Sequence, residues 1–410
     1  MTSRTLPPRI VAILFATVCC VWSTHLVAQS QPPVDALLDG SSLEDLWVHV
    51  NAQDWEDLHT HFEENTYYPA DVEWRGIRVR NAAIRARGVA SRNGHKPSFR
   101  IDFNRYVTGQ TFFGLDALTL DSSWQDPSMI TNRLSMLLFR RMGIAAPRVA
   151  HVRLFAGAGR EYVGVYAVTE EVTPSFLRTN FGEDTGNLYE FNHLQNDHWG
   201  FQDPGPPLGW YVPRFTPKTH DFDSVAALYT PIRDLVQRIN DAPQSDLESR
   251  LNGYLDINTF ITELAIQNFV AQGDGIVGGV GANNFYLYRF AGKTLSVLIP
   301  WDQGNAFGTP DLLPSYNMDT NVLTAKIWNE PTYRARYLGT LLQIAELVSR
   351  DGFLLAEAQR DYQQIRDAVY VDAFAPYPLT QFEQMHVTVQ QFIRTRPDIV
   401  RQYVASLVQQ

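Results

Sequence analysis

The feature that most constrains this chain is a segment near its middle, residues 273–308, in which two aspartates flank a predicted β-hairpin. Two strand-like stretches, rich in aromatic and β-branched residues, are joined by a short glycine-containing turn within residues 284–299. A hairpin returns its two ends to one place, so Asn284 and Asp302 are expected to lie roughly 5 Å apart across the strand pair. Asp274 precedes them by one glycine-rich loop. Two carboxylates and a carboxamide are therefore expected to converge.

Oxygen-bearing side chains of this kind suit a hard cation such as Mg²⁺, which takes one or two carboxylates and completes its shell with water and phosphate oxygens. The order Asp, loop, Asn, hairpin, Asp also matches the order of parts in protein kinases, where the first Asp accepts a proton and the later residues hold metal. The alternative interpretation is structural, with Asp274 capping a turn and Asp302 ordering the loop after Pro300.

The first 28 residues have the pattern of a secretory signal. Two arginines, Arg4 and Arg9, precede an apolar run at residues 10–22, and Ala28 offers a small residue at which cleavage is expected. The run is too short to span a bilayer comfortably, although an uncleaved anchor is the alternative. The sequence thus predicts a secreted, periplasmic or cell-surface protein, with no stable membrane insertion after the signal is cleaved.

Cysteine content and net charge exclude several classes of protein and of site. Both cysteines lie within the predicted signal, so the mature chain would have neither disulfides nor thiolate metal sites. The whole chain carries a net charge of −10, which argues against a general nucleic-acid or anionic-membrane binder, because such proteins rely on basic surfaces. An anionic nucleotide would still need a local cation and a metal.

The order of predicted elements indicates an α+β protein with two lobes. Residues 29–172 contain short alternating stretches and one helix that begins at Asp126-Pro127, which predicts a mixed, β-rich N-terminal lobe. Residues 173–410 are mainly helical and include the catalytic hairpin at 274–308. Asp256 is expected to cap a helix that ends at Gly273 and delivers Asp274. The last 70 residues are predicted to form three more helices and contain no chemical motif.

A series of short motifs gives the chain a resemblance to the CotH family of atypical, secreted protein kinases, over roughly residues 85–308. No single motif is specific, but all of them occur in the family's order. They are Arg87-Gly88, Lys96-Pro97-Ser98-Phe99-Arg100, Phe113-Gly114-Leu115, Asp126-Pro127-Ser128, Gly164-Val165-Tyr166 with Glu170, Gly186-Asn187-Leu188-Tyr189, Asn284-Phe285-Tyr286-Leu287-Tyr288 and Ile299-Pro300-Trp301-Asp302.

The resemblance implies a two-lobed atypical kinase fold, ATP and Mg²⁺ or Mn²⁺ as cofactors, and an exported protein as the substrate. It implies that Asp274 is the catalytic base and that Asn284 and Asp302 are metal ligands, with Asn283 as an alternative to its neighbour. It further implies that Lys96 contacts nucleotide phosphates. Glu170 matches a family glutamate that would pair with Lys96 or hold a metal-bound water. The alternative for Glu170 is a structural ion pair. The alternative for Lys96 is a solvated position on the surface.

Two departures from the family pattern leave the activity open. Val89-Ala90 stand where the family has Asn-Ser, and Gly304 stands where a second acid commonly follows the Trp-Asp pair. Loss of a carboxylate would weaken metal binding or change metal preference. The alternative functions are therefore a non-catalytic pseudokinase or surface-adhesion protein that retains the fold and, less strongly, a hydrolase that uses the two aspartates as paired carboxylates, as glycosidases do.

Overall fold

The computed structural model describes Met1 and residues 35–408. Residues 35–408 fall in a compact unit from Pro33 to Gln410. The predicted signal segment therefore lies outside the described residues. Among residues 35–408 no helix has the length and apolar character needed to cross a membrane.

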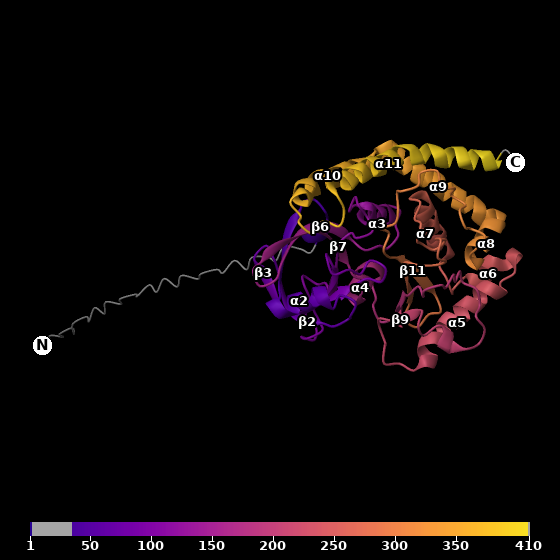
Figure 1. The fold of residues 1–410 in the computed structure, drawn as a ribbon. Helices are drawn as coiled ribbons and strands as arrows, with labels where there is room; N and C mark the ends of the chain where they lie inside the picture. The colour runs from indigo at the N-terminus through magenta and orange to yellow at the C-terminus, as the bar shows by residue number, and fades with distance from the viewer. Residues whose placement is uncertain (2–34, 409–410) are drawn as a thin grey trace. The chain divides into compact units, whose positions relative to one another are not determined.

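The first half of this unit is a closed β-barrel (Figure 1). Its strands pair in the order β1-β2-β3-β4-β5-β7-β6, all antiparallel except for the parallel pair β1–β6 that closes it. Its elements are α1 (Asp35–Leu38), β1 (Glu44–His49), α2 (Ala52–Thr60), β2 (Tyr68–Trp74), β3 (Ile77–Arg87), β4 (Ser98–Asp102), β5 (Ala117–Asp121), α3 (Thr131–Arg141), β6 (Val149–Ala156) and β7 (Glu161–Glu170).

The barrel closes around its own apolar core. Strand side chains alternate between its two faces, so that in β1 the buried residues are Leu46 and Val48. They pack with Val72, Trp74 and Phe99 from the neighbouring strands. Because a closed barrel has no free strand edge, this half of the chain satisfies its backbone hydrogen bonds internally.

The second half combines a small sheet with many helices. Its four strands are antiparallel in the order β11-β10-β8-β9. Its elements are α4 (Pro174–Phe181), β8 (Asn187–Phe191), β9 (Phe215–Pro217), α5 (Val225–Asp241), α6 (Leu247–Leu251), α7 (Ile257–Phe269), β10 (Phe285–Arg289), β11 (Ser296–Pro300), α8 (Val322–Asn329), α9 (Pro331–Asp351), α10 (Phe353–Tyr370) and α11 (Leu379–Val408).

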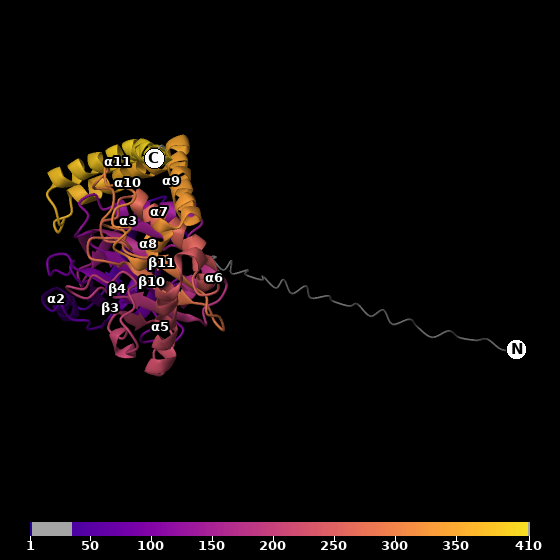
Figure 2. The same ribbon diagram turned by 90° about the vertical axis from the view of Figure 1, so that its right-hand side faces the viewer.

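The predicted α+β class is confirmed, with one barrel and one smaller sheet accompanied by helices. The last 70 residues form most of α9, together with α10 and α11, which lie side by side along one edge of the unit (Figure 2). Of these, α10 also contacts β7 of the barrel and α3. The C-terminal helices therefore bridge the barrel and the rest of the unit.

Candidate functional site

Helix α7 and the loop after it carry Asp274. Asp256 caps α7 as predicted, since its carboxylate accepts hydrogen bonds from the backbone nitrogen and the hydroxyl of Thr259. The helix ends at Phe269, four residues before the predicted end at Gly273. The backbone nitrogen of Gly273 then donates to the carbonyl of Asn305, at 3.0 Å. The start of the Asp274 loop is thus tied to the segment that follows Asp302.

Two asparagines hold Asp274 from the other side of its loop. The amide nitrogen of Asn283 donates to Oδ1 of Asp274 at 3.0 Å. The amide nitrogen of Asn284 donates to the carbonyl oxygen of Asp274 at 2.8 Å and to its Oδ2 at 3.2 Å. Each asparagine uses its nitrogen here and keeps its amide oxygen as a possible ligand. The predicted contact between Asp274 and the asparagine pair is therefore present in the structure.

Asp302 follows the return strand of the predicted hairpin. Strands β10 and β11 pair with Phe285 opposite Pro300, and the backbone nitrogen of Trp301 donates to the carbonyl of Asn284 at 3.0 Å. Asp302 is thus one residue beyond the position that faces Asn284. Both residues have left-handed backbones, with φ of 58° at Asn284 and 43° at Asp302. Such strain in non-glycine residues clusters at functional sites.

Electrostatics connect Asp302 to Asp274. The pKa of Asp302 is raised to about 6, chiefly by burial and also by the carboxylates of Asp121 and Asp274, while the guanidinium of Arg87 acts in the opposite direction. The carboxylates of Asp274 and Asp302 therefore lie close enough to interact electrostatically and do not lie on opposite surfaces. A divalent cation would relieve the repulsion between these carboxylates.

Arg87 is the cation of this site, and sequence reasoning assigned it no role there. It ends β3, and its guanidinium lies 5.6 Å from the ring centroid of Trp301. Burial by itself would lower the pKa of Arg87, but Glu171, Asp121 and Asp302 outweigh it and raise the pKa. The available signal was its place in the Arg-Gly motif.

Lys96 lies elsewhere, in a closed ion pair. Its ammonium donates to Oδ2 of Asp372 at 2.7 Å and to the carbonyl of Val165 at 2.9 Å, and it faces the Tyr166 ring at 4.9 Å. The residue is 1% exposed. This placement does not fit the prediction that Lys96 contacts nucleotide phosphates, because the ammonium is enclosed and donates two of its three hydrogens within the protein. The alternative of a solvated surface lysine is equally wrong.

Glu170 also lies apart from the Asp274–Asp302 pair. Its carboxylate accepts hydrogen bonds from the Nε and Nη2 of Arg148, at 2.9 and 2.8 Å. Glu170 therefore forms the structural ion pair given as the alternative, and the predicted pairing with Lys96 is wrong. The next residue, Glu171, follows the end of β7, and its carboxylate acts on the site by raising the pKa of Arg87. Burial would raise the pKa of Glu171, but Arg100 and Arg87 hold it at about 2.

The residues present fit a small divalent ion with few protein ligands. No group of three or more His, Cys, Asp or Glu arranged to hold a metal occurs among residues 35–408. A site here would use Asp302 and the amide oxygen of Asn284, with Asp274 beside them, a set that suits Mg²⁺ or Mn²⁺ completed by water and phosphate. A Cβ at Gly304 would lie 3.5 Å from Oδ1 of Asp302, so an acid in that place would adjoin the same carboxylate.

Together, the barrel, the helices and the hairpin define an α+β protein with an acidic, oxygen-rich site that contains one arginine. The family model described as "CotH kinase protein" matches residues 84–400, most of the chain. The chain belongs to the CotH family. It is also 23% identical over 371 residues to the inner spore coat protein H of Bacillus subtilis (strain 168), a match covering 88% of this chain and 97% of that protein. The family match extends through α8, α9 and α10 and into α11, beyond the range of the motifs.

Proposed function

We propose that this protein is an atypical kinase with a two-lobed kinase-like fold, which transfers the γ-phosphoryl group of ATP to a serine or threonine of an exported protein. The proposal rests on the convergence of Asp274, Asn284 and Asp302. Asn284 binds Asp274, the two carboxylates interact electrostatically, and Arg87 lies beside them. A signal-like N-terminus and the likeness to a spore coat protein support action outside the cytoplasm.

Each residue of the candidate site has its own role in the proposed phosphoryl transfer. Asp274 accepts the proton of the acceptor hydroxyl, whose oxygen forms a bond to the γ-phosphorus while the bond from phosphorus to the bridging oxygen of ADP breaks. Asn283 and Asn284 fix the Asp274 carboxylate, and Arg87 offsets phosphate charge. Asp302 and Asn284 would hold Mg²⁺ or Mn²⁺, which neutralises the phosphates when bound.

The Asp274→Ala variant tests this function directly. A general base contributes about 10² to 10⁴ in rate, so transfer of radiolabelled phosphate to co-incubated exported proteins should fall at least about 100-fold. Mass spectrometry would identify the modified residues. Asp319→Ala is the matched control, because Asp319 is an exposed acid in a loop. A loss below about threefold in Asp274→Ala would exclude the role of base.

The second candidate is a non-catalytic protein that retains the fold for scaffolding or surface adhesion. Three observations favour it: the enclosure of Lys96, the absence of an acid at Gly304, and an exposed Val89 in place of a polar residue. Binding of Mg·ATP without transfer to any acceptor would support a nucleotide-regulated scaffold. Absence of both binding and transfer would support adhesion.

A further inference from the structure

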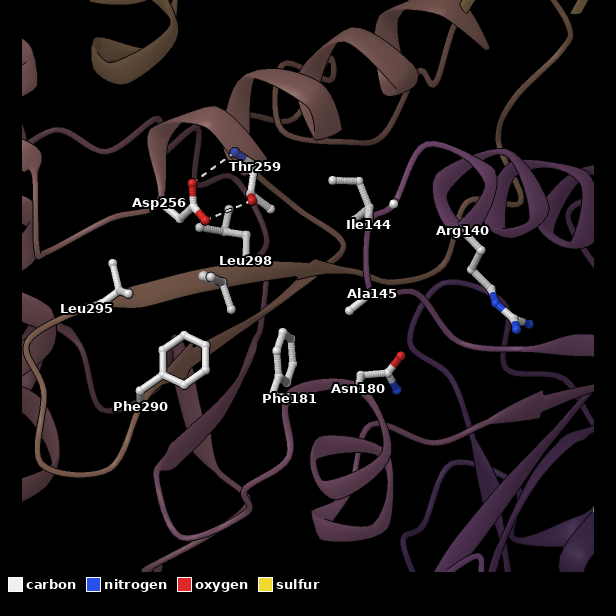
Figure 3. Close-up of a pocket in the computed structure, with 12 residues that line it drawn as sticks. Arg140, Ile144, Ala145, Asn180, Phe181, Asp256, Thr259, Phe290, Leu295 and Leu298 are labelled. Carbon is white, nitrogen blue, oxygen red and sulfur yellow. Dashed lines mark hydrogen bonds between the residues drawn. The ribbon is translucent and has the colours of Figure 1, made fainter. Parts of the chain in front are cut away.

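A cavity lies apart from the candidate active site. It has a volume of about 430 Å³, within the range of small-molecule sites, and is lined by parts of α3, α4, α7 and the β10–β11 hairpin (Figure 3). Neither Asp274, Asn284, Asp302 nor Arg87 lines it. Any ligand here would be distinct from the nucleotide proposed above.

The body of this cavity is apolar. Phe181 and Phe290 meet edge to face, with ring centroids 5.5 Å apart and planes at 89°. Ile144 and Leu298 form the opposite wall, and Ala145 lies between the two walls in Figure 3. Such walls accept an aromatic or aliphatic group of the ligand.

The polar groups of the cavity lie at its two ends and differ in what they offer. At one end the Asp256 carboxylate is occupied by Thr259, which donates to it from its backbone nitrogen and hydroxyl at 3.1 and 2.9 Å. At the other end lie Arg140 and Asn180 (Figure 3). The Asn180 amide nitrogen donates one hydrogen to the Phe176 carbonyl at 2.9 Å and retains a second.

Arg140 is a cation without a matching carboxylate. Within residues 35–408 its guanidinium forms neither an ion pair nor a side-chain hydrogen bond. It lies in the last turn of α3, where the helix dipole favours a positive charge. Burial and the nearby Arg148 lower its pKa. The carboxylates closest to Arg148 are already bound to it, namely Glu170 and Asp35. Both carboxylates also act on Arg140 at longer range, but neither forms an ion pair with it, so its guanidinium is open to an anion in the cavity.

We propose that this cavity is a binding site for a small amphipathic anion, with its apolar body between Phe181, Phe290 and Leu298 and its acidic head at Arg140. The site does not depend on the proposed kinase activity. Leu298 belongs to β11, the strand that leads to Asp302, so occupancy would contact the hairpin of the candidate active site from outside it.

The test uses two dyes that share one ring system. Anilinonaphthalene sulfonate carries the anionic head, and N-phenylnaphthylamine lacks it; binding of each to the full chain is followed by fluorescence titration, with stoichiometry from calorimetry. Arg140→Gln should weaken binding of the sulfonate about fivefold, the effect of one exposed charge pair, and leave the neutral dye unchanged. Ala145→Phe, which fills the cavity, should weaken both.

Arg141→Gln is the matched control, because the adjacent Arg141 lies over the Phe353 ring at 5.1 Å and does not line the cavity. It should bind both dyes as the wild type does. Failure of the wild type to bind one equivalent of the sulfonate would overturn the proposal. So would equal affinity of the wild type and Arg140→Gln for it, a comparison that holds even if Ala145→Phe does not fold.

Discussion

At the scale of single residues, the site depends on the electrostatic interactions among the guanidinium of Arg87 and four carboxylates, those of Asp121, Glu171, Asp274 and Asp302. Asp302 has a strained backbone and a pKa raised to about 6, first by burial and then by Asp121 and Asp274. Arg87 acts in the opposite direction. A cation beside Asp302 therefore favours the ionised form that binding of a metal requires.

Glu263 gives the fold a pH dependence of its own. It is fully buried on α7, neither carboxyl oxygen has a hydrogen-bond partner among residues 35–408, and burial raises its pKa from 4.5 to about 8. Between these values the folded chain binds a proton that the unfolded chain does not, so stability falls as pH rises. Between pH 5 and 8 the wild type should lose more than about 1 kcal/mol of unfolding free energy that Glu263→Gln retains.

Thermal unfolding at the two pH values measures this difference. Glu248→Gln removes an exposed acid and should keep the pH dependence of the wild type. If Glu263→Gln and the wild type lose stability in parallel, the carboxyl is not protonated in the folded state.

Sequence reasoning predicted the proximity of candidate residues that lie close together along the chain, but not the contacts of those that lie far apart. Asp274, Asn284 and Asp302 fall within one segment, and local strand and turn patterns suffice to bring them together. Lys96 is paired with Asp372, 276 positions later, and nothing local reveals that contact. Arg87 at the end of β3 and Lys96 just before β4 are both basic residues near strand ends, and only the three-dimensional packing separates their roles.

At the scale of elements, the hairpin and α7 were predictable because each has a local signature. Asp256 caps α7, and β10 and β11 were expected from their aromatic and β-branched residues. The end of α7 was not predictable from the local sequence, because a residue of α11 binds the last turn of this helix. Arg396, fully buried, donates to the carbonyls of Phe269 at 2.8 Å and Asn268 at 2.6 Å. Both carbonyls belong to the last turn of α7, where the regular helical hydrogen bonds end.

Arg396→Met should therefore destabilise the fold by at least about 2 kcal/mol, because buried carbonyls lose their donors. Its guanidinium also binds the carbonyls of Pro310 and Leu312, at 2.6 Å each. Urea unfolding measures the effect. Arg394→Met, two positions earlier on the exposed face of α11, is the control and should change stability little. Equal unfolding midpoints for the two variants would show that Arg396 does not support α7.

At the scale of the whole described unit, the C-terminal helices hold the barrel as well as α7. Between α10 and α11, Asp372 accepts hydrogen bonds from Lys96 and from the backbone nitrogen of Val165, at 3.1 Å for the latter. Gly164 leaves the space for this contact, since a Cβ there would meet Oδ2 of Asp372 at 2.2 Å. The last helices contain no chemical motif, but they fix elements on both sides of the candidate site.

Asp372→Asn should cost about 3 to 5 kcal/mol of unfolding free energy, because it leaves the buried ammonium of Lys96 without its counter-ion. Asp367→Asn on α10, whose side chain is 96% exposed, should have little effect. The double variant Lys96→Met with Asp372→Leu should recover part of the loss, since it removes both buried charges. Chemical denaturation measures the unfolding free energies of all three proteins. A double variant as unstable as Asp372→Asn would contradict this account of the Lys96–Asp372 ion pair.

The measurement that tests the central claim most directly is a calorimetric titration of Mg·ATP into the wild type and Asp302→Ala, each repeated with ATP and a chelator. The account predicts that the wild type binds one nucleotide only when the metal is present. It also predicts that Asp302→Ala loses this binding by at least about tenfold, since a metal ligand is removed. A wild type that binds no nucleotide, or an Asp302→Ala variant that binds Mg·ATP equally well, would contradict it.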